Sequence, residues 1–241
     1  MTPDHKLLPH ESVIAIADIE RLWTKRRSAR VVLNEMGLWW PWRDLESFIP
    51  LCRVCRLPTD AGSECSDTCR ALAGWFTIDF ATYSTARALE PLLRMFKDAS
   101  QPPPWVTALL QDLVDECSEG APAGTTIITV PHNRDRRWEP NATIWERWTT
   151  RLPTCTIPRP PAGRPPRGSI DPARYNVSAL DPPPTVILLD DLWTTGATLG
   201  SLAHSLRHAG TTCITAIAVG RQLRPNRPAS ARAYRALADR R

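Results

Sequence analysis

The stretch VILLDDLWTTGATL, from Val186 to Leu199, constrains the fold more than any other part of the sequence. Its four leading apolar residues are typical of a strand that a parallel sheet buries on both faces. We expect this strand to cover residues 185–189 and a helix to cover residues 198–208, with a loop of small residues between them. This succession predicts an α/β protein with a parallel sheet.

The loop between the strand and the helix has the composition of a phosphate-binding loop. At a helix start the backbone N–H groups point outward without intrahelical partners, and the helix dipole favours a dianion there. Gly196 would let the backbone approach the phosphate with no side chain in the way, while Thr194 and Thr198 would add hydroxyl donors. The predicted phosphate ligands are Thr194, Thr195, Gly196, Ala197 and Thr198.

Two adjacent carboxylates, Asp190 and Asp191, follow the apolar run. Open parallel sheets bind ligands at the carboxyl ends of their strands, so we expect both aspartates to face the ligand. Their oxygens could accept hydrogen bonds from ribose hydroxyls, directly or through Mg²⁺, which makes both residues candidate catalytic groups. The alternative is an ordinary strand–turn–helix in which the aspartates only cap the helix.

Four of the seven cysteines form two closely spaced pairs, Cys52-x2-Cys55 and Cys65-x3-Cys69. Thiolates in such pairs are the ligands that tetrahedral zinc prefers. Four protein ligands leave no open position, so the predicted zinc is structural and supplies folding free energy to a small module. The alternative is a chance cluster of free thiols in a reducing compartment. The remaining cysteines are scattered and are expected to be buried apolar thiols: Cys117, Cys155 and Cys213.

The pattern of apolar residues divides the chain into three regions. Residues 1–50 are expected to be helical, residues 51–75 to form the zinc-binding module, and residues 76–241 to form the α/β domain. Further helices are predicted over residues 12–23, 28–36, 84–96, 104–117, 141–151 and 230–239, and further strands over 126–130, 154–157 and 213–219. Residues 158–184 are rich in Pro, Gly and Arg, and a loop of this length is typically functional or disordered.

Composition restricts the class of protein and its compartment. Of the 241 residues, 42% are hydrophobic and 23% charged, the balance of a globular protein. No apolar run reaches the roughly 18 residues that span a bilayer, and the first residues lack the order of a secretory signal, so we expect a cytoplasmic protein with no membrane partner. The net charge of +5 would attract phosphates of any kind, and it supports a nucleic-acid partner only weakly.

The stretch from Val186 to Leu199 resembles the motif by which type I phosphoribosyltransferases bind phosphoribosyl pyrophosphate (PRPP). From about Leu51 onward the chain is similar to the ComF-like family, in which a small zinc-binding module precedes a phosphoribosyltransferase domain. Besides the cysteines, the resemblance rests on residues 83–97, Val130-Pro131, Arg174-Tyr175-Asn176-Val177 and the strand that reaches Gly220-Arg221. It implies a Rossmann-like sheet that holds Mg²⁺-bound PRPP. It also implies transfer of the phosphoribosyl group to a nitrogen nucleophile, such as that of a nucleobase, with release of pyrophosphate.

The chain departs from the family pattern after Val130-Pro131. The family usually has a basic loop that leads to Arg-Gly-Phe-Asn, whereas here Trp138-Glu139-Pro140 precedes the retained Asn141. The resemblance implies that this loop binds the pyrophosphate, and its arginines could form bidentate hydrogen bonds with a diphosphate. The alternative is an exposed basic turn. The candidate pyrophosphate ligands are Arg134, Arg136 and Arg137, and candidates for closing over the site are Arg164, Arg167 and Arg174.

Three functions stay open at this level. The first is a phosphoribosyltransferase, a glycosyltransferase of nucleotide metabolism with PRPP and a nitrogen acceptor as substrates. The altered basic loop slightly favours the second, a non-catalytic PRPP-binding protein that acts in regulation or with the DNA-uptake machinery of competence. The third, a zinc-dependent DNA-binding protein, rests on the net charge and the cysteines alone.

Overall fold

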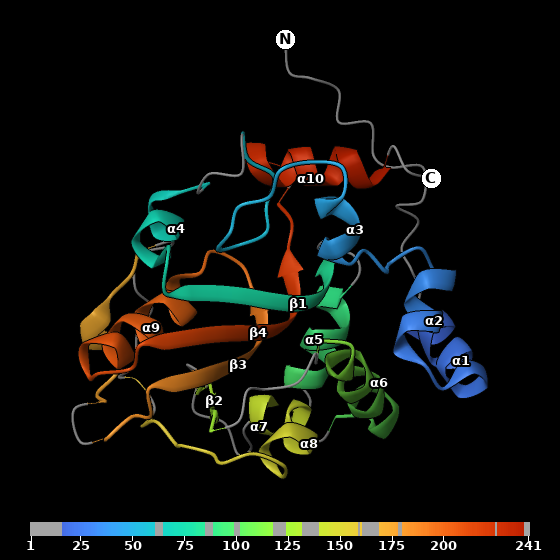
Figure 1. Ribbon diagram of the computed structural model, residues 1–241. Helices are drawn as coiled ribbons and strands as arrows, with labels where there is room; N and C mark the ends of the chain where they lie inside the picture. Colours follow the sequence, from blue (N-terminus) through green and yellow to red (C-terminus); the bar gives the residue numbers. More distant parts are fainter. Residues whose placement is uncertain are drawn as a thin grey trace.

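A four-stranded parallel sheet forms the centre of the computed structural model (Figure 1). The structure describes residues 16–60, 65–84, 89–98, 102–117, 124–131, 140–158, 160, 169–177, 180–224 and 226–238. The strands are β1 (Phe76–Ser84), β2 (Thr126–Thr129), β3 (Thr185–Trp193) and β4 (Cys213–Gln222), and they lie in the order β1-β4-β3-β2. Every pairing is parallel, so all four strands end at the same edge of the sheet.

Helices cover both faces of the sheet and give three layers (Figure 1). One face packs against α3 (Trp42–Glu46), α4 (Asp67–Leu72), the 3-10 helix η1 (Pro172–Arg174), α9 (Ala197–His208) and α10 (Pro228–Ala238). The other face packs against α1 (Ile16–Arg26), α2 (Ala29–Glu35), α5 (Leu89–Asp98), α6 (Pro104–Asp115), α7 (Pro140–Ile144) and α8 (Glu146–Thr149). The predicted α/β class with a parallel sheet is therefore confirmed. Within the described ranges, no helix combines the length and apolarity that a membrane crossing needs.

β3 shows why the apolar run becomes a central strand. Val186 and Leu188 are buried in the core that includes α9, whereas Ile187 and Leu189 are buried in the core that includes α6. Successive side chains of a strand point to opposite faces, so an uninterrupted apolar run suits a strand that is covered on both sides. β3 and its neighbour β4 occupy the two inner positions of the sheet, as this pattern requires.

Several boundaries differ from those that the sequence predicts. β3 runs on to Trp193, because the two aspartates stay within the strand instead of ending it. The helix predicted over residues 141–151 is two short helices, α7 and α8, which meet at Trp145. The strand predicted over residues 154–157 is reduced to a single parallel bridge between Thr154 and Ile127.

β1 is an edge strand that the sequence pattern did not predict. It reads FTIDFATYS, with polar residues that interrupt the apolar ones. Tertiary contacts explain why these polar residues are tolerated: the Asp79 carboxylate accepts hydrogen bonds from Trp42 Nε1 at 2.6 Å and from Arg43 Nη2 at 3.2 Å. Thr82 Oγ1 likewise accepts from the Trp40 backbone N–H at 2.8 Å. Such partners override local strand propensity and cannot be inferred from a short window of sequence.

Candidate functional site

The loop from Thr194 to Thr198 connects the end of β3 to the start of α9. Gly196 caps the helix with a left-handed φ of 82°, and its carbonyl accepts the first helical hydrogen bond, from Gly200 N at 2.7 Å. Thr195 Oγ1 accepts a hydrogen bond from Ala197 N at 3.4 Å. The first turn of α9 therefore presents backbone N–H groups at the carboxyl edge of the sheet, where the sequence predicts a phosphate-binding site.

Gly196 is required for a reason other than the one that the sequence suggests. A Cβ atom at position 196 would overlap Cζ2 of the Trp193 ring and would lie 2.9 Å from its Cη2 atom. The ring itself is buried, and the positive φ already disfavours any other residue. A side chain at position 196 would thus displace Trp193 and destabilise the fold as well as disturb the loop.

The structure places Asp190 and Asp191 on opposite faces of the sheet. Both are buried, with 9% and 5% of their surface exposed. Asp191 forms an ion pair with Lys97 of α5 on one face, whereas Asp190 lies near Tyr175 on the other. Adjacent residues of a strand alternate in direction, so the extension of β3 through both aspartates separates them. Asp190 lies on the same face as α9, the helix that the loop opens.

The segment 169–177 packs along α9 and brings a buried tyrosine to this face. Ser201 Oγ accepts a hydrogen bond from Asp171 N at 2.9 Å, and Ser205 Oγ donates one to the Pro172 carbonyl at 2.5 Å. Burial, and next the Asp190 carboxylate, raise the pKa of Tyr175 to about 12, so its hydroxyl stays protonated at neutral pH. Arg174, one of the candidates for closing over the site, is buried beside it.

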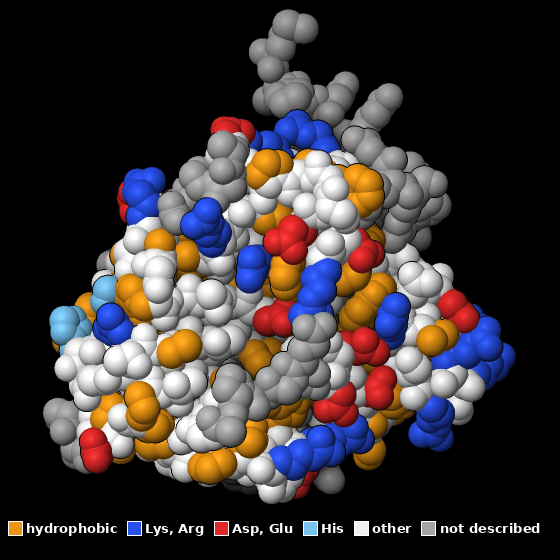
Figure 2. Space-filling model, in the orientation of Figure 1, with side chains coloured by type: hydrophobic (Ala, Val, Ile, Leu, Met, Phe, Trp, Pro, Cys, Tyr) orange, Lys and Arg blue, Asp and Glu red, His pale blue; other side chains and the backbone are white. Residues whose placement is uncertain are grey.

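Arg134, Arg136 and Arg137 belong to residues 132–139, and Arg164 and Arg167 to residues 161–168, which lie outside the described part of the chain. On the face drawn in Figure 2, the described acidic and basic side chains are interspersed and do not form one continuous basic patch.

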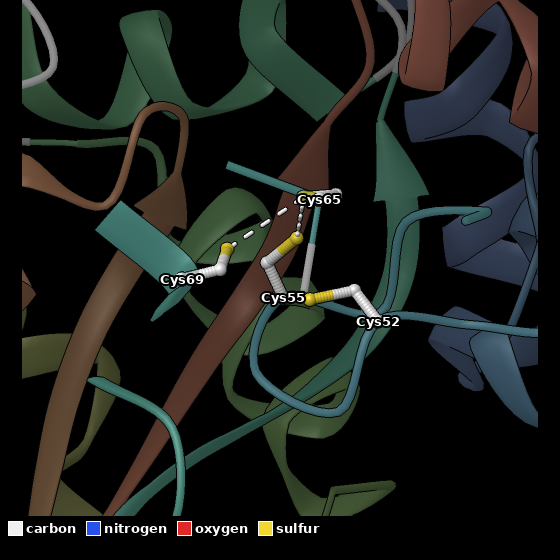
Figure 3. Close-up of side chains that lie close together, drawn as sticks. All are labelled: Cys52, Cys55, Cys65 and Cys69. Carbon is white, nitrogen blue, oxygen red and sulfur yellow. Dashed lines mark hydrogen bonds between the residues drawn. The ribbon is translucent and has the colours of Figure 1, made fainter. Parts of the chain in front are cut away.

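The second feature is the cluster of Cys52, Cys55, Cys65 and Cys69, whose sulfur atoms all lie within 4.8 Å of one another (Figure 3). Cys55 Sγ lies 3.0 Å from Cys65 Sγ, and Cys65 Sγ lies 3.6 Å from Cys69 Sγ. Tetrahedral zinc with Zn–S bonds of about 2.3 Å needs sulfurs about 3.8 Å apart. The predicted clustering of the four cysteines is confirmed, and their geometry is compatible with a structural zinc ion.

Local turns aim the four thiols at one point. Cys52 N donates to the Leu57 carbonyl at 2.7 Å, and Arg56, with a left-handed φ of 57°, donates to the Cys52 carbonyl at 3.0 Å. We call this tight turn, residues 51–58, the cysteine knuckle. On the other side Ser66 caps α4 by accepting from Cys69 N at 3.2 Å, which fixes Cys69 in the first turn of that helix.

The four thiols of the cluster influence one another's ionisation. Hydrogen bonds from the neighbouring thiols, Cys55 first, hold the pKa of Cys52 far below its usual range. The pKa of Cys69 is raised far above its usual range, because its thiol is the donor to Cys52 and is buried. One thiolate is thus stabilised at the expense of the others, and four thiolates at this spacing need a divalent cation among them.

Two further residues lie at the site without a role assigned from the sequence, Tyr175 and Arg221. Their only signals in the sequence are the Arg174–Val177 tetrapeptide and the Gly220-Arg221 strand end, and neither pattern specifies a contact. Searches with this chain find no matching family model, no similar curated protein and no similar solved structure. The assignment of function consequently rests on the residues and their geometry.

Proposed function

We propose that this protein binds the phosphorylated ribose of PRPP and belongs with the ComF-like phosphoribosyltransferases. The proposal rests on two features that meet at the carboxyl end of the central strand β3. The Thr194–Thr198 loop leaves the strand there, and the buried carboxylate of Asp190 lies just before it. The loop offers backbone N–H groups and the positive end of α9 to the 5-phosphate. Asp190 offers a carboxylate to the ribose hydroxyls or to their Mg²⁺.

The proposed reaction is displacement of pyrophosphate from the anomeric carbon of PRPP. A nitrogen lone pair forms the new bond to that carbon while the bond to the diphosphate oxygen breaks, and pyrophosphate leaves with the electron pair. The carbon has oxocarbenium character at the transition state, so a carboxylate near the ribose and cations near the diphosphate lower the barrier. Arg134, Arg136 and Arg137 are the proposed cations, and the protonated Tyr175 is a candidate donor beside Asp190.

We also propose that the four cysteines hold one structural zinc ion. The buried cysteines pack in the same core as Phe76, Trp193 and Leu199, so the cluster stabilises the side of the sheet from which α9 starts. Four thiolate ligands leave zinc no open coordination position, which assigns the metal to folding and not to the reaction.

Calorimetric titration with Mg-PRPP tests the proposed function. We expect saturable binding that depends on the 5-phosphate, so that ribose 5-phosphate binds and ribose does not. A parallel assay should detect pyrophosphate release in the presence of one member of a nucleobase panel. An absence of binding heat with PRPP would overturn the proposal. Binding without pyrophosphate release for any base would replace the enzyme with the non-catalytic PRPP-binding protein.

The two aspartates should respond differently to substitution. We expect Asp190→Asn to weaken ribose 5-phosphate binding about tenfold or more, because an amide cannot replace a charged acceptor. Asp191→Asn should mainly lower the free energy of unfolding, by about 1–3 kcal/mol, because it leaves the partly buried ammonium of Lys97 without its charged acceptor. Calorimetry and urea unfolding of both variants measure the two effects. Equal losses of affinity would show that the faces of the sheet do not separate their roles.

A further inference from the structure

Arg221 occupies the middle of the carboxyl edge of the sheet. It is the penultimate residue of β4, in register with Tyr83 of β1 on one side and with Trp193 of β3 on the other. Only 5% of its surface is exposed. A buried guanidinium at this position is costly unless several acceptors surround it, so its contacts identify what it holds together.

The guanidinium of Arg221 contacts the phosphate loop and the cysteine knuckle at the same time. Its Nη1 donates to the Thr194 carbonyl at 2.6 Å and to the Trp193 carbonyl at 3.0 Å, where the loop leaves β3. Its Nε donates to the Cys55 carbonyl in a longer bond of 3.4 Å. A further bond joins Nη1 to the carbonyl of Gln222 at 3.2 Å. One side chain thus bridges a cysteine of the metal cluster and the first residue of the loop.

Trp193 extends this link into the loop. The Arg221 guanidinium carbon lies 5.8 Å from the centre of the Trp193 ring, and that ring fills the space beside Gly196. The ring also packs against Phe76 of β1, with a centroid separation of 5.8 Å. A shift of Arg221 would therefore change both the carbonyls at which the loop starts and the ring against which Gly196 rests.

Charge supplies a second reason to connect Arg221 with the cysteines. Its acceptors among the described residues are carbonyl oxygens, and no carboxylate of those residues lies within ion-pair distance. Four thiolates around one Zn²⁺ would carry a net charge of −2. Two of them, Cys52 and Cys55, belong to the cysteine knuckle, whose Cys55 carbonyl accepts the hydrogen bond from Arg221. A metal-loaded cluster would thus be the counter-charge that a buried guanidinium at this position needs.

We propose that Arg221 is a positioning residue that couples the metal centre to the phosphate loop, an inference that rests on the proposed function of that loop. When the cysteines hold their metal, the knuckle carbonyl and the thiolate charge fix the guanidinium, and the guanidinium fixes the start of the loop. Coupling between two sites is reciprocal, so a ligand in the phosphate loop must also stabilise the metal in its cluster.

The test measures the zinc affinity of the intact protein by equilibrium competition with a chromogenic chelator, with and without saturating ribose 5-phosphate. Ribose 5-phosphate is the probe because the diphosphate of PRPP would itself bind zinc. In the parent protein we expect the ligand to raise the zinc affinity, and so protect the metal from the chelator, at least about fivefold, the lower end of typical allosteric coupling. Arg221→Met should abolish this protection. Arg221→Lys should retain most of the zinc affinity through its charge, yet lose the protection. One ammonium group cannot donate to the Cys55 carbonyl and to the carbonyls of the loop at the same time, as the guanidinium does.

Arg207→Met is the matched control. The Arg207 guanidinium also binds two backbone carbonyls, those of Thr211 and Thr212, but at the far end of α9. The Arg207→Met variant should therefore keep the protection of zinc by ribose 5-phosphate. If the parent binds ribose 5-phosphate and the ligand does not raise the zinc affinity, the coupling is refuted while the proposed function stands. Full protection in a folded Arg221→Lys protein refutes it equally. If the parent binds no ribose 5-phosphate in the calorimeter, both proposals fail together.

Discussion

Cys52→Ser should cost the protein its zinc and lower its melting temperature by about 10 °C or more. A serine hydroxyl is a poor zinc ligand, and structural zinc contributes about 10–16 kcal/mol of apparent binding free energy in small zinc modules. Losing even about 4 kcal/mol of this shifts the melting temperature of a chain of this size by roughly 10 °C. The effect should extend beyond the knuckle, because Cys52, Cys55 and Cys69 share their core with Phe76 and Trp193.

Elemental analysis and differential scanning calorimetry check this expectation. The freshly purified parent should contain about one zinc per chain, as one tetrahedral site of four thiolates predicts. Cys213→Ser is the control, since Cys213 is exposed at the start of β4 and lies outside the cluster. It should keep the zinc and the melting temperature of the parent. A Cys52→Ser protein that melts like the parent, or a parent that contains no zinc, would contradict the structural role.

Thr198→Glu should abolish phosphate binding without destabilising the protein. Thr198 is the second residue of α9, and a carboxylate in the first turn of a helix stabilises it by about 0.3–1 kcal/mol. The same charge would stand close to the phosphate. Two unit charges about 4 Å apart repel by about 4 kcal/mol at an effective dielectric constant of 20, which corresponds to far more than a tenfold loss of affinity.

Val31→Glu provides a matched control for this substitution. Val31 is exposed and is the third residue of α2, so the variant adds the same charge to the first turn of a different helix. Calorimetry with ribose 5-phosphate should show parent-like affinity for Val31→Glu and no measurable binding for Thr198→Glu, with both variants at least as stable as the parent. Retained affinity in Thr198→Glu would remove the start of α9 from the ligand site.

Local sequence determined the strand, loop and helix around Gly196 and the clustering of the four cysteines. A run of apolar residues, a glycine before a helix and two short-spaced cysteine pairs each act within a few residues of the chain. Their physical effects are therefore visible in the sequence itself. The confirmed helices over 16–26, 29–35 and 104–115 belong to the same class of local pattern.

Tertiary structure alone decided how these local pieces meet. β1 forms because Trp42 and Arg43 satisfy the carboxylate of Asp79, 37 and 36 residues away. Asp190 and Asp191 separate because β3 continues through both of them between two cores. Successive side chains of a strand point to opposite faces, so the two carboxylates lie on different sides of the sheet. Arg221 joins the Cys55 and Thr194 carbonyls, which lie 166 and 27 residues away along the chain. Such contacts depend on which strands become neighbours in the sheet, and a long-range pairing leaves no periodic signal in the residues that it brings together.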